Sequence, residues 1–209
     1  MTNHKRHHLI QFIGITLLVS MICSGCAGMP GTNLEKQRYL LNVHRQPDQS
    51  ETTGELVVKV RRFHVSSRFS GKSLTYRFGE VSYKADFYNE FLTTPASNIT
   101  EEATKWLGES GVFSDVAPTT STAQADLLLE GSISNLYGDY RVKGKPRAVM
   151  GAWFVLLDND GAIEFRKSYE AIVKLGSNKP DELIKGLSGC LAEILTDLET
   201  DLRETYGQR

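Results

Sequence analysis

The chain has 209 residues, of which 40% are hydrophobic and 23% charged, with 24 Lys and Arg against 25 Asp and Glu. These values are typical of a folded domain and exclude disorder of the whole chain. The balanced charge argues against nucleic acid as the main partner, because phosphate binding usually requires a basic excess. The length predicts one domain or two small ones.

The first 25 residues have the features of a bacterial export signal. A basic head at residues 4–8 precedes an apolar run at 9–22, which is shorter than the ~20 apolar residues that span a bilayer. The run leads to Cys26, and the serine and glycine before it resemble the small residues of a lipobox. Cys23 fits less well because two bulky residues precede it. We therefore predict a lipoprotein signal peptide at 1–25, with an ordinary secretory signal or a transmembrane anchor as alternatives.

The mature protein would then begin at Cys26, carrying a covalent diacylglycerol and an N-acyl chain that attach it to a membrane without spanning it. Residues 26–38 form a short tether to a domain at 39–209. The residue after Cys26 is alanine rather than aspartate, which by the enterobacterial sorting rule predicts the periplasmic face of the outer membrane. The inner membrane is the alternative location in organisms whose lipoprotein sorting rules differ. The mature chain has 184 residues, a net charge of −3, and Cys190 as its one unacylated cysteine, so we expect no internal disulfide.

Short alternating segments predict a sheet with several strands. Apolar residues alternate or run continuously in seven segments, and Gly79 and Gly161 lie where hairpins would turn. The phase of alternation slips at Arg61 and Arg62, which indicates a bulge. The expected strands cover residues 39–43, 56–65, 74–78, 81–85, 127–137, 148–157 and 163–173.

Two helices are predicted from their caps and apolar stripes. Thr94 and Pro95 suit the start of the first helix, and Gly111 its end. The second begins after Pro180 and carries apolar residues at helical spacing through Leu202, with Cys190 among them as a packing residue. We expect a single α+β domain: an antiparallel-rich mixed sheet with about two main helices packed on it.

The sequence offers little material for catalysis. His44 and His64 are the two histidines of the mature chain, and neither has a motif neighbour. Residues 66–73 approach a nucleotide-binding loop, but a strand-like segment follows where a helix is needed. We expect no catalytic residues, no metal and no cofactor besides the lipid on Cys26. A periplasmic hydrolase that uses His44 or His64 is the enzymatic alternative.

Two groups of residues are candidates for binding a partner. Arg141, Lys143, Lys145 and Arg147 fall within seven residues, and they form either a solvated loop or a docking loop for an acidic partner or lipid headgroups. The other group is aromatic and serves either as a binding surface or as core packing. It consists of Phe87, Tyr88 and Phe91.

An ordered set of short motifs resembles the ABC-type transport auxiliary lipoproteins, the family that includes PqiC. The motifs are RYLLNV at 38–43, DFYNEF at 86–91, WL at 106–107, SGVF at 110–113, LYGD at 136–139 and PRAV at 146–149. The resemblance implies a periplasmic, membrane-tethered accessory subunit of an ABC-type phospholipid transport system. Its implied partner is a mammalian-cell-entry (MCE) domain protein, and phospholipid is a further candidate ligand. The alternative is an outer-membrane lipoprotein that activates a cell-wall synthase or another envelope complex.

Overall fold

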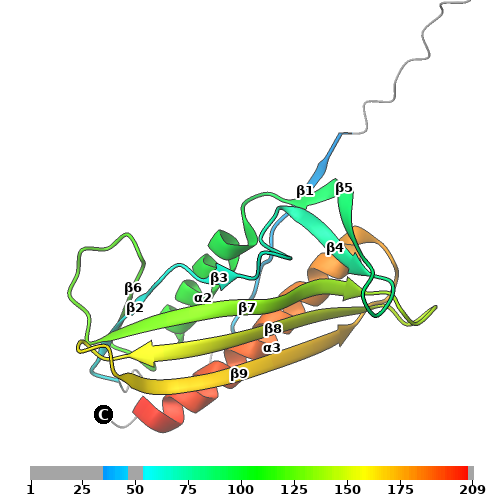
Figure 1. Ribbon diagram of the computed structural model, residues 1–209. Helices are drawn as coiled ribbons and strands as arrows, with labels where there is room; N and C mark the ends of the chain where they lie inside the picture. The colour runs from blue at the N-terminus through cyan, green and yellow to red at the C-terminus, as the bar shows by residue number, and fades with distance from the viewer. Residues whose placement is uncertain (1–34, 47–53, 207–209) are drawn as a thin grey trace, which may run out of the picture. The chain divides into compact units, whose positions relative to one another are not determined.

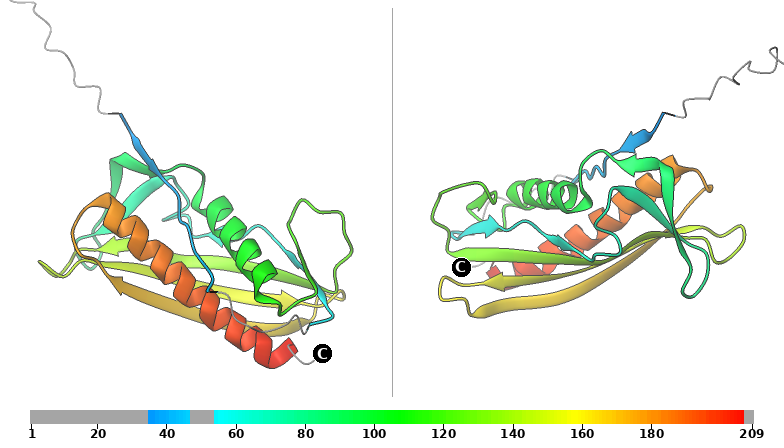
Figure 2. Two further views of the ribbon diagram at one scale, coloured as in Figure 1. Left: turned by 180° about the vertical axis from the view of Figure 1, so that it is seen from behind. Right: turned by 45° about the horizontal axis from the view of Figure 1, so that its top comes forward.

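The computed structural model describes residues 35–46 and 54–206. The predicted signal peptide and Cys26 lie outside the described residues. From Lys36 onward the described chain forms one compact unit, a mixed sheet with two helices packed on one of its faces (Figures 1 and 2). The α+β class predicted from the sequence is confirmed.

Three long strands form an antiparallel meander: β7 (Leu127–Asp139), β8 (Arg147–Leu157) and β9 (Ile163–Lys174). Alternate residues of β8, including Met150, Phe154 and Leu156, are buried beneath the helices. Val149 and Val155 of β8 are also buried, as a continuous apolar run predicts for a central strand, whereas burial alternates in the first half of β7. This half of the sheet matches the prediction closely.

The other edge of β7 pairs with three short strands, all parallel to it. These are β2 (Val57–Val60), β3 (His64–Val65) and β4 (Ser73–Arg77). The single strand expected at 56–65 is therefore two strands, separated where the alternation slips. A further strand, β6 (Asp115–Ala117), pairs with β2 and was not predicted, because three residues are too few to show a period.

A hairpin joins β4 to β5 (Tyr83–Phe91), and β1 (Gln37–Tyr39) lies parallel to β5 at the edge of the sheet. The first strand was predicted at 39–43, and that prediction is wrong: residues 40–46 are not in the sheet. Side chains of the helices take the place of a neighbouring strand there. The Leu41 amide donates to Asn98 Oδ1 (2.7 Å), and Asn98 Nδ2 donates to the Leu41 carbonyl (3.1 Å).

The helices are α2 (Pro95–Ser110) and α3 (Pro180–Tyr206). The predicted caps of α2 are confirmed: the Thr94 hydroxyl accepts from the Ser97 amide, and Gly111 has a φ of 70°. The predicted apolar stripe of α3 is buried along its length. Burial raises the pKa of the Cys190 thiol to about 11, in agreement with its role in packing.

Candidate functional site

The predicted basic loop and the β4–β5 turn lie at the same end of the sheet (Figure 1). The loop, residues 140–146, joins β7 to β8, while residues 78–82 join β4 to β5. Tyr76 pairs with Gly138 in the sheet, and the Tyr140 amide donates to the Arg77 carbonyl (2.8 Å). These bonds hold the two connections next to each other. We refer to them together as the loop end.

A buried carboxylate fixes the ends of the basic loop. Asp139 is the last residue of β7, and its side chain is 3% exposed. It accepts hydrogen bonds from Arg141 Nη2 (2.8 Å) and Arg147 Nη2 (3.0 Å), and from the Arg141 amide (3.1 Å). The hydrogen bonds from Arg141 hold the pKa of Asp139 well below its usual range. Asp139 is therefore charged and binds both arginines.

The four predicted basic residues thus divide into two pairs. Arg141 and Arg147 are bound to Asp139, whereas Lys143 and Lys145 are exposed and make no ion pair with any described residue. Gly144 lies between the lysines with a φ of 73°, which glycine adopts without strain. The arginines position the loop, and the two lysines are the charges available to a partner.

Exposed apolar side chains accompany these lysines at the loop end. Val81 at the hairpin turn is 92% exposed, and Val142 and Phe78 are about half exposed. The turn rises from an aromatic base in which the Phe78 and Tyr76 rings each pack against Tyr140, at 5.8 and 5.3 Å between centroids. The packed rings therefore support apolar side chains that are exposed at the loop end. No sequence motif indicates this exposure, because it depends on the direction in which the turns project.

The structure separates the three predicted aromatic residues. Phe91 is 2% exposed and belongs to the core, so its prediction as a surface residue is wrong. Phe87 and Tyr88 are 72% and 43% exposed. Strict alternation would place Phe87 and Phe91, which are four residues apart, on the same face, so their different exposure requires an interruption of the strand.

A bulge in β5 turns Phe87 and Tyr88 outward. The pairing with β4 shifts register between Ser73 and Thr75, so that extra residues of β5 loop out. The Asp86 carboxylate closes this bulge by accepting from the amides of Tyr88 (2.8 Å) and Asn89 (3.0 Å). Burial acts to raise the pKa of Asp86, but the Tyr76 hydroxyl (2.8 Å) and the other donors lower it overall.

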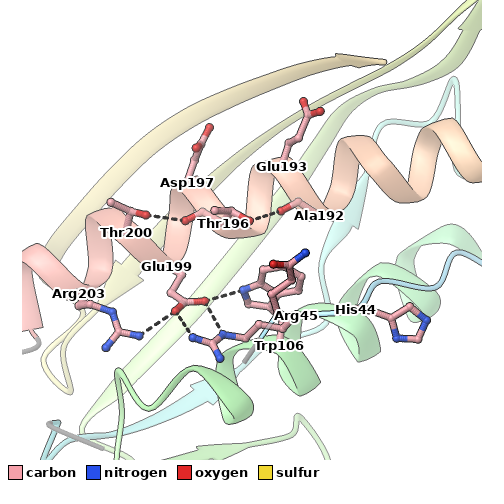
Figure 3. Close-up of a pocket in the computed structure, with 11 residues that line it drawn as sticks. His44, Arg45, Trp106, Ala192, Glu193, Thr196, Asp197, Glu199, Thr200 and Arg203 are labelled. Carbon is pink, nitrogen blue, oxygen red and sulfur yellow. Dashed lines mark hydrogen bonds and ion pairs between the residues drawn. The ribbon is translucent and has the colours of Figure 1, made fainter. Parts of the chain in front are cut away.

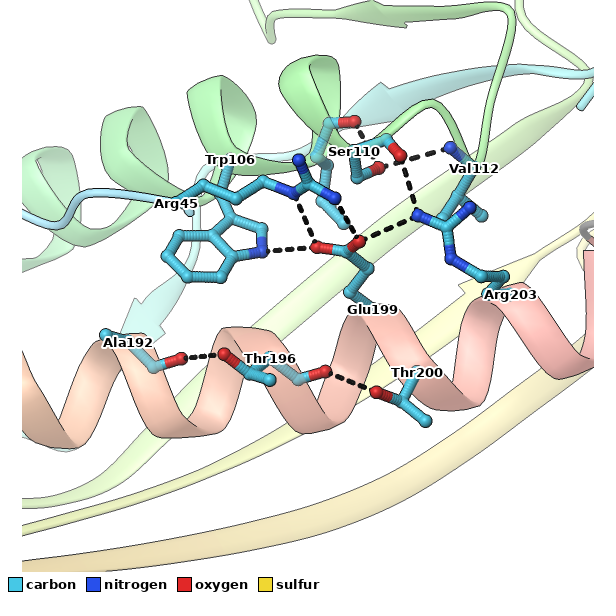
Figure 4. A network of polar contacts seen from close by, with 10 residues as sticks. Arg45, Trp106, Ser110, Val112, Ala192, Thr196, Glu199, Thr200 and Arg203 are labelled. Carbon is cyan, nitrogen blue, oxygen red and sulfur yellow. Dashed lines mark hydrogen bonds and ion pairs between the residues drawn. The ribbon is translucent and has the colours of Figure 1, made fainter. Parts of the chain in front are cut away.

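A second carboxylate cluster lies between the helices (Figure 4). Glu199 of α3 accepts from Arg45 Nη2 (2.7 Å), Arg203 Nη2 (2.8 Å) and Trp106 Nε1 (2.9 Å). Arg203 also donates to the carbonyl of Ser110, the last residue of α2. Burial acts to raise the pKa of Glu199, but the arginines hold it below its usual value. The cluster ties α3 to α2 and to the segment at 40–46.

A groove of about 900 Å³ runs beside this cluster, lined by residues 44–46 and the outer side of α3 (Figure 3). The His44 ring in it points away from Glu199. His64 is exposed on β3, in another part of the fold. The described residues contain no group of three His, Cys, Asp or Glu side chains able to hold a metal. None of their helices is both long and apolar enough to cross a membrane.

Neither a protein-family model nor a curated protein matches the sequence. Among solved structures, the chain is similar to a Xanthomonas campestris protein described by the family model DUF330, with a TM-score of 0.69 at 13% identity over 78% of this chain and 92% of the other. An uncharacterized protein gives a TM-score of 0.65 at 14% identity, over 80% and 99%. A minor lipoprotein from Acinetobacter baumannii gives 0.41 at 6% identity, over 71% and 92%. The first two similarities show that this α+β fold occurs in other chains.

Proposed function

We propose that the protein is a membrane-anchored accessory lipoprotein of the bacterial envelope that binds a partner protein through its loop end. The resemblance of its motifs to ABC-type transport auxiliary lipoproteins makes an MCE-domain protein of a phospholipid transport system the partner to test. The protein itself would not be an enzyme. Cys26 would carry the lipid, and the outer membrane is the location that its following residue favours.

The observation that carries this proposal is the construction of the loop end. Lys143 and Lys145 are exposed beside Val81 and Val142, and a binding surface needs both apolar area and charges that are free to pair. Asp139 binds both arginines and fixes the loop, so a partner would meet a preformed surface rather than order a flexible one.

The test is binding of the full-length, lipidated protein to a purified MCE-domain protein encoded near its gene. We expect the double variant Lys143→Glu and Lys145→Glu to weaken this binding at least tenfold and to reduce its dependence on salt. Val81→Ser should weaken it through loss of apolar contact. Surface plasmon resonance on captured vesicles measures the affinity of the wild type and of both variants, and its dependence on salt.

The matched control reverses two exposed charges elsewhere, with Lys105→Glu on α2 and Arg166→Glu on β9. It changes the net charge by the same amount and should leave binding within twofold of the wild type. Equal loss in both double variants would show a general charge effect and overturn the assignment of the loop end. Binding to a cell-wall transpeptidase, with none to the MCE protein, would replace the proposed partner with the alternative one.

A further inference from the structure

A second exposed surface lies where the described domain begins. Three apolar side chains of the β1–β5 edge are exposed: Phe87 (72%), Leu40 (45%) and Leu92 (46%). The Leu92 amide donates to the Tyr39 carbonyl (2.7 Å), which places Leu92 next to Leu40 across the strand pair. We refer to these three residues, with Tyr88, as the edge patch.

Cations surround the edge patch. Lys36 Nζ lies 5.6 Å from the centre of the Phe87 ring, and Arg38 and Lys72 are exposed nearby. Glu90 binds Lys36 (2.9 Å) and Arg38 (3.2 Å), so this carboxylate partly neutralises them. With Asp86 in the bulge and Glu35 next to Lys36 in sequence, three positive and three negative charges lie in these surroundings. The edge is therefore close to neutral, whereas the mature chain as a whole has a net charge of −3.

Chain length places the edge patch near the predicted lipid. Nine residues lie between Cys26 and Lys36, and the ten Cα-to-Cα steps that join the two reach at most about 35 Å in fully extended chain. Lys36 contacts both Phe87 and Glu90. If Cys26 is acylated, the edge patch is therefore the part of the folded domain that the anchor keeps closest to the bilayer.

We propose that the edge patch contacts the membrane surface, with Phe87 and the two leucines in the headgroup region and the cations next to lipid phosphates. The proposal rests on the lipid anchor of the proposed function and adds an orientation to it. Aromatic and aliphatic side chains flanked by lysine and arginine are the composition of interfacial membrane contacts. The acyl chains supply the affinity, and the patch fixes which face of the domain turns toward the bilayer.

The test uses the cysteine content of the mature chain. Cys190 is 0% exposed and Cys26 would be acylated, so a cysteine introduced at an exposed position can be labelled selectively. Three full-length variants, Phe87→Cys, Val81→Cys and Ile163→Cys, receive an environment-sensitive nitrobenzoxadiazole label. They are reconstituted in vesicles of phosphatidylethanolamine and phosphatidylglycerol, with or without nitroxide-labelled acyl chains. Flotation with the vesicles and the mass of the mature protein report the anchor separately.

We expect a blue shift and nitroxide quenching at position 87 only. Ile163 is a matched control, because it is 53% exposed and pairs at the opposite end of the meander from β4. A protein that floats while position 87 stays in water overturns the membrane contact and leaves the anchor intact. Quenching at position 81 instead would show that the loop end, rather than the edge patch, contacts the bilayer. A shift at 87 that requires the MCE protein makes the edge patch a partner surface, and failure to float overturns both the anchor and this proposal.

Discussion

Asp139 and Glu199 are two buried carboxylates that each bind two arginines. The arginines at Asp139 are more exposed to solvent than those at Glu199. The side chains of Arg141 and Arg147 beside Asp139 are 35% and 36% exposed, whereas beside Glu199 the side chain of Arg45 is 8% and that of Arg203 26% exposed. Asp139 connects residues eight or fewer positions apart, while Glu199 connects segments separated by 154 residues in sequence. One carboxylate shapes a surface loop, and the other holds separate elements of the fold together.

The difference in exposure predicts that similar ion pairs have unequal effects on stability. An arginine that keeps contact with water loses little when its carboxylate is removed, because solvent replaces the partner. An arginine that is only 8% exposed has little contact with water to replace a lost carboxylate, so the loss costs more. Each of the following predictions tests this distinction, beginning with the largest expected effect.

Glu199→Gln should lower the free energy of unfolding by about 3 kcal/mol, because it removes the buried negative charge to which Arg45, Arg203 and Trp106 all donate. Urea denaturation followed by circular dichroism measures the loss. Glu193→Gln is the matched control, as the same change on an exposed position of the same helix, and should stay within about 0.5 kcal/mol. Equal losses in the two variants would contradict a special role for Glu199.

Asp139→Asn should lower the free energy of unfolding less, by about 1–2 kcal/mol, since Arg141 and Arg147 remain partly hydrated. Its larger effect should be local. The Arg141 amide donates to this carboxylate, so hydrogen exchange at residues 140–146 should accelerate while α3 keeps its protection. A larger global loss than in Glu199→Gln would reverse the comparison.

Both carboxylates should make stability fall in acid. Their pKa values are lowered in the folded state, so each contributes stability that is complete above the unfolded pKa of about 4 and is lost as pH falls through the folded pKa. Denaturation midpoints between pH 7 and pH 3 measure the decline. The double variant Asp139→Asn with Glu199→Gln should decline less steeply than the wild type, and parallel curves would contradict this linkage.

The smallest effect on stability is expected from Lys143→Glu with Lys145→Glu. These lysines make no ion pair among the described residues, so the melting temperature should remain within about 2 °C of the wild type. The same variant is expected to lose partner binding. A clear loss of stability would show that the lysines support the loop rather than serve a partner.

Local patterns in the sequence predicted most of the fold, because the residues buried in the core follow the spacing of the apolar residues along the chain. The alternation at the start of β7 and the stripe of α3 each mark one buried face, the continuous apolar run of β8 marks a central strand, and Gly111 marks a helix end. The apolar residues at 39–43 predicted a strand, and Leu41 and Val43 are buried, but such a run shows only that a segment is extended. It does not show whether another strand or two helices cover that segment, and here the helices do.

The candidate site was less predictable because it depends on contacts between distant segments and on the paths of turns. The basic loop was visible as a run of charges, yet the burial of Asp139 that binds its arginines follows from the fold around β7. Phe87 and Phe91 look equivalent in sequence. The bulge closed by Asp86 places them on opposite sides of the sheet surface, and nothing in their spacing alone indicates that bulge.

The segment at 40–46 has a mechanical consequence for a tethered protein. A pull on Lys36 along β1 would load the parallel hydrogen bonds to β5 in shear first, and behind them the Asn98 bonds to Leu41 and the Arg45–Glu199 pair. Bonds loaded in shear must fail almost simultaneously, whereas bonds at the end of a hairpin open one after another. The domain would therefore remain folded under tension between its anchor and a bound partner, and force would pass through α2 and α3 to the sheet.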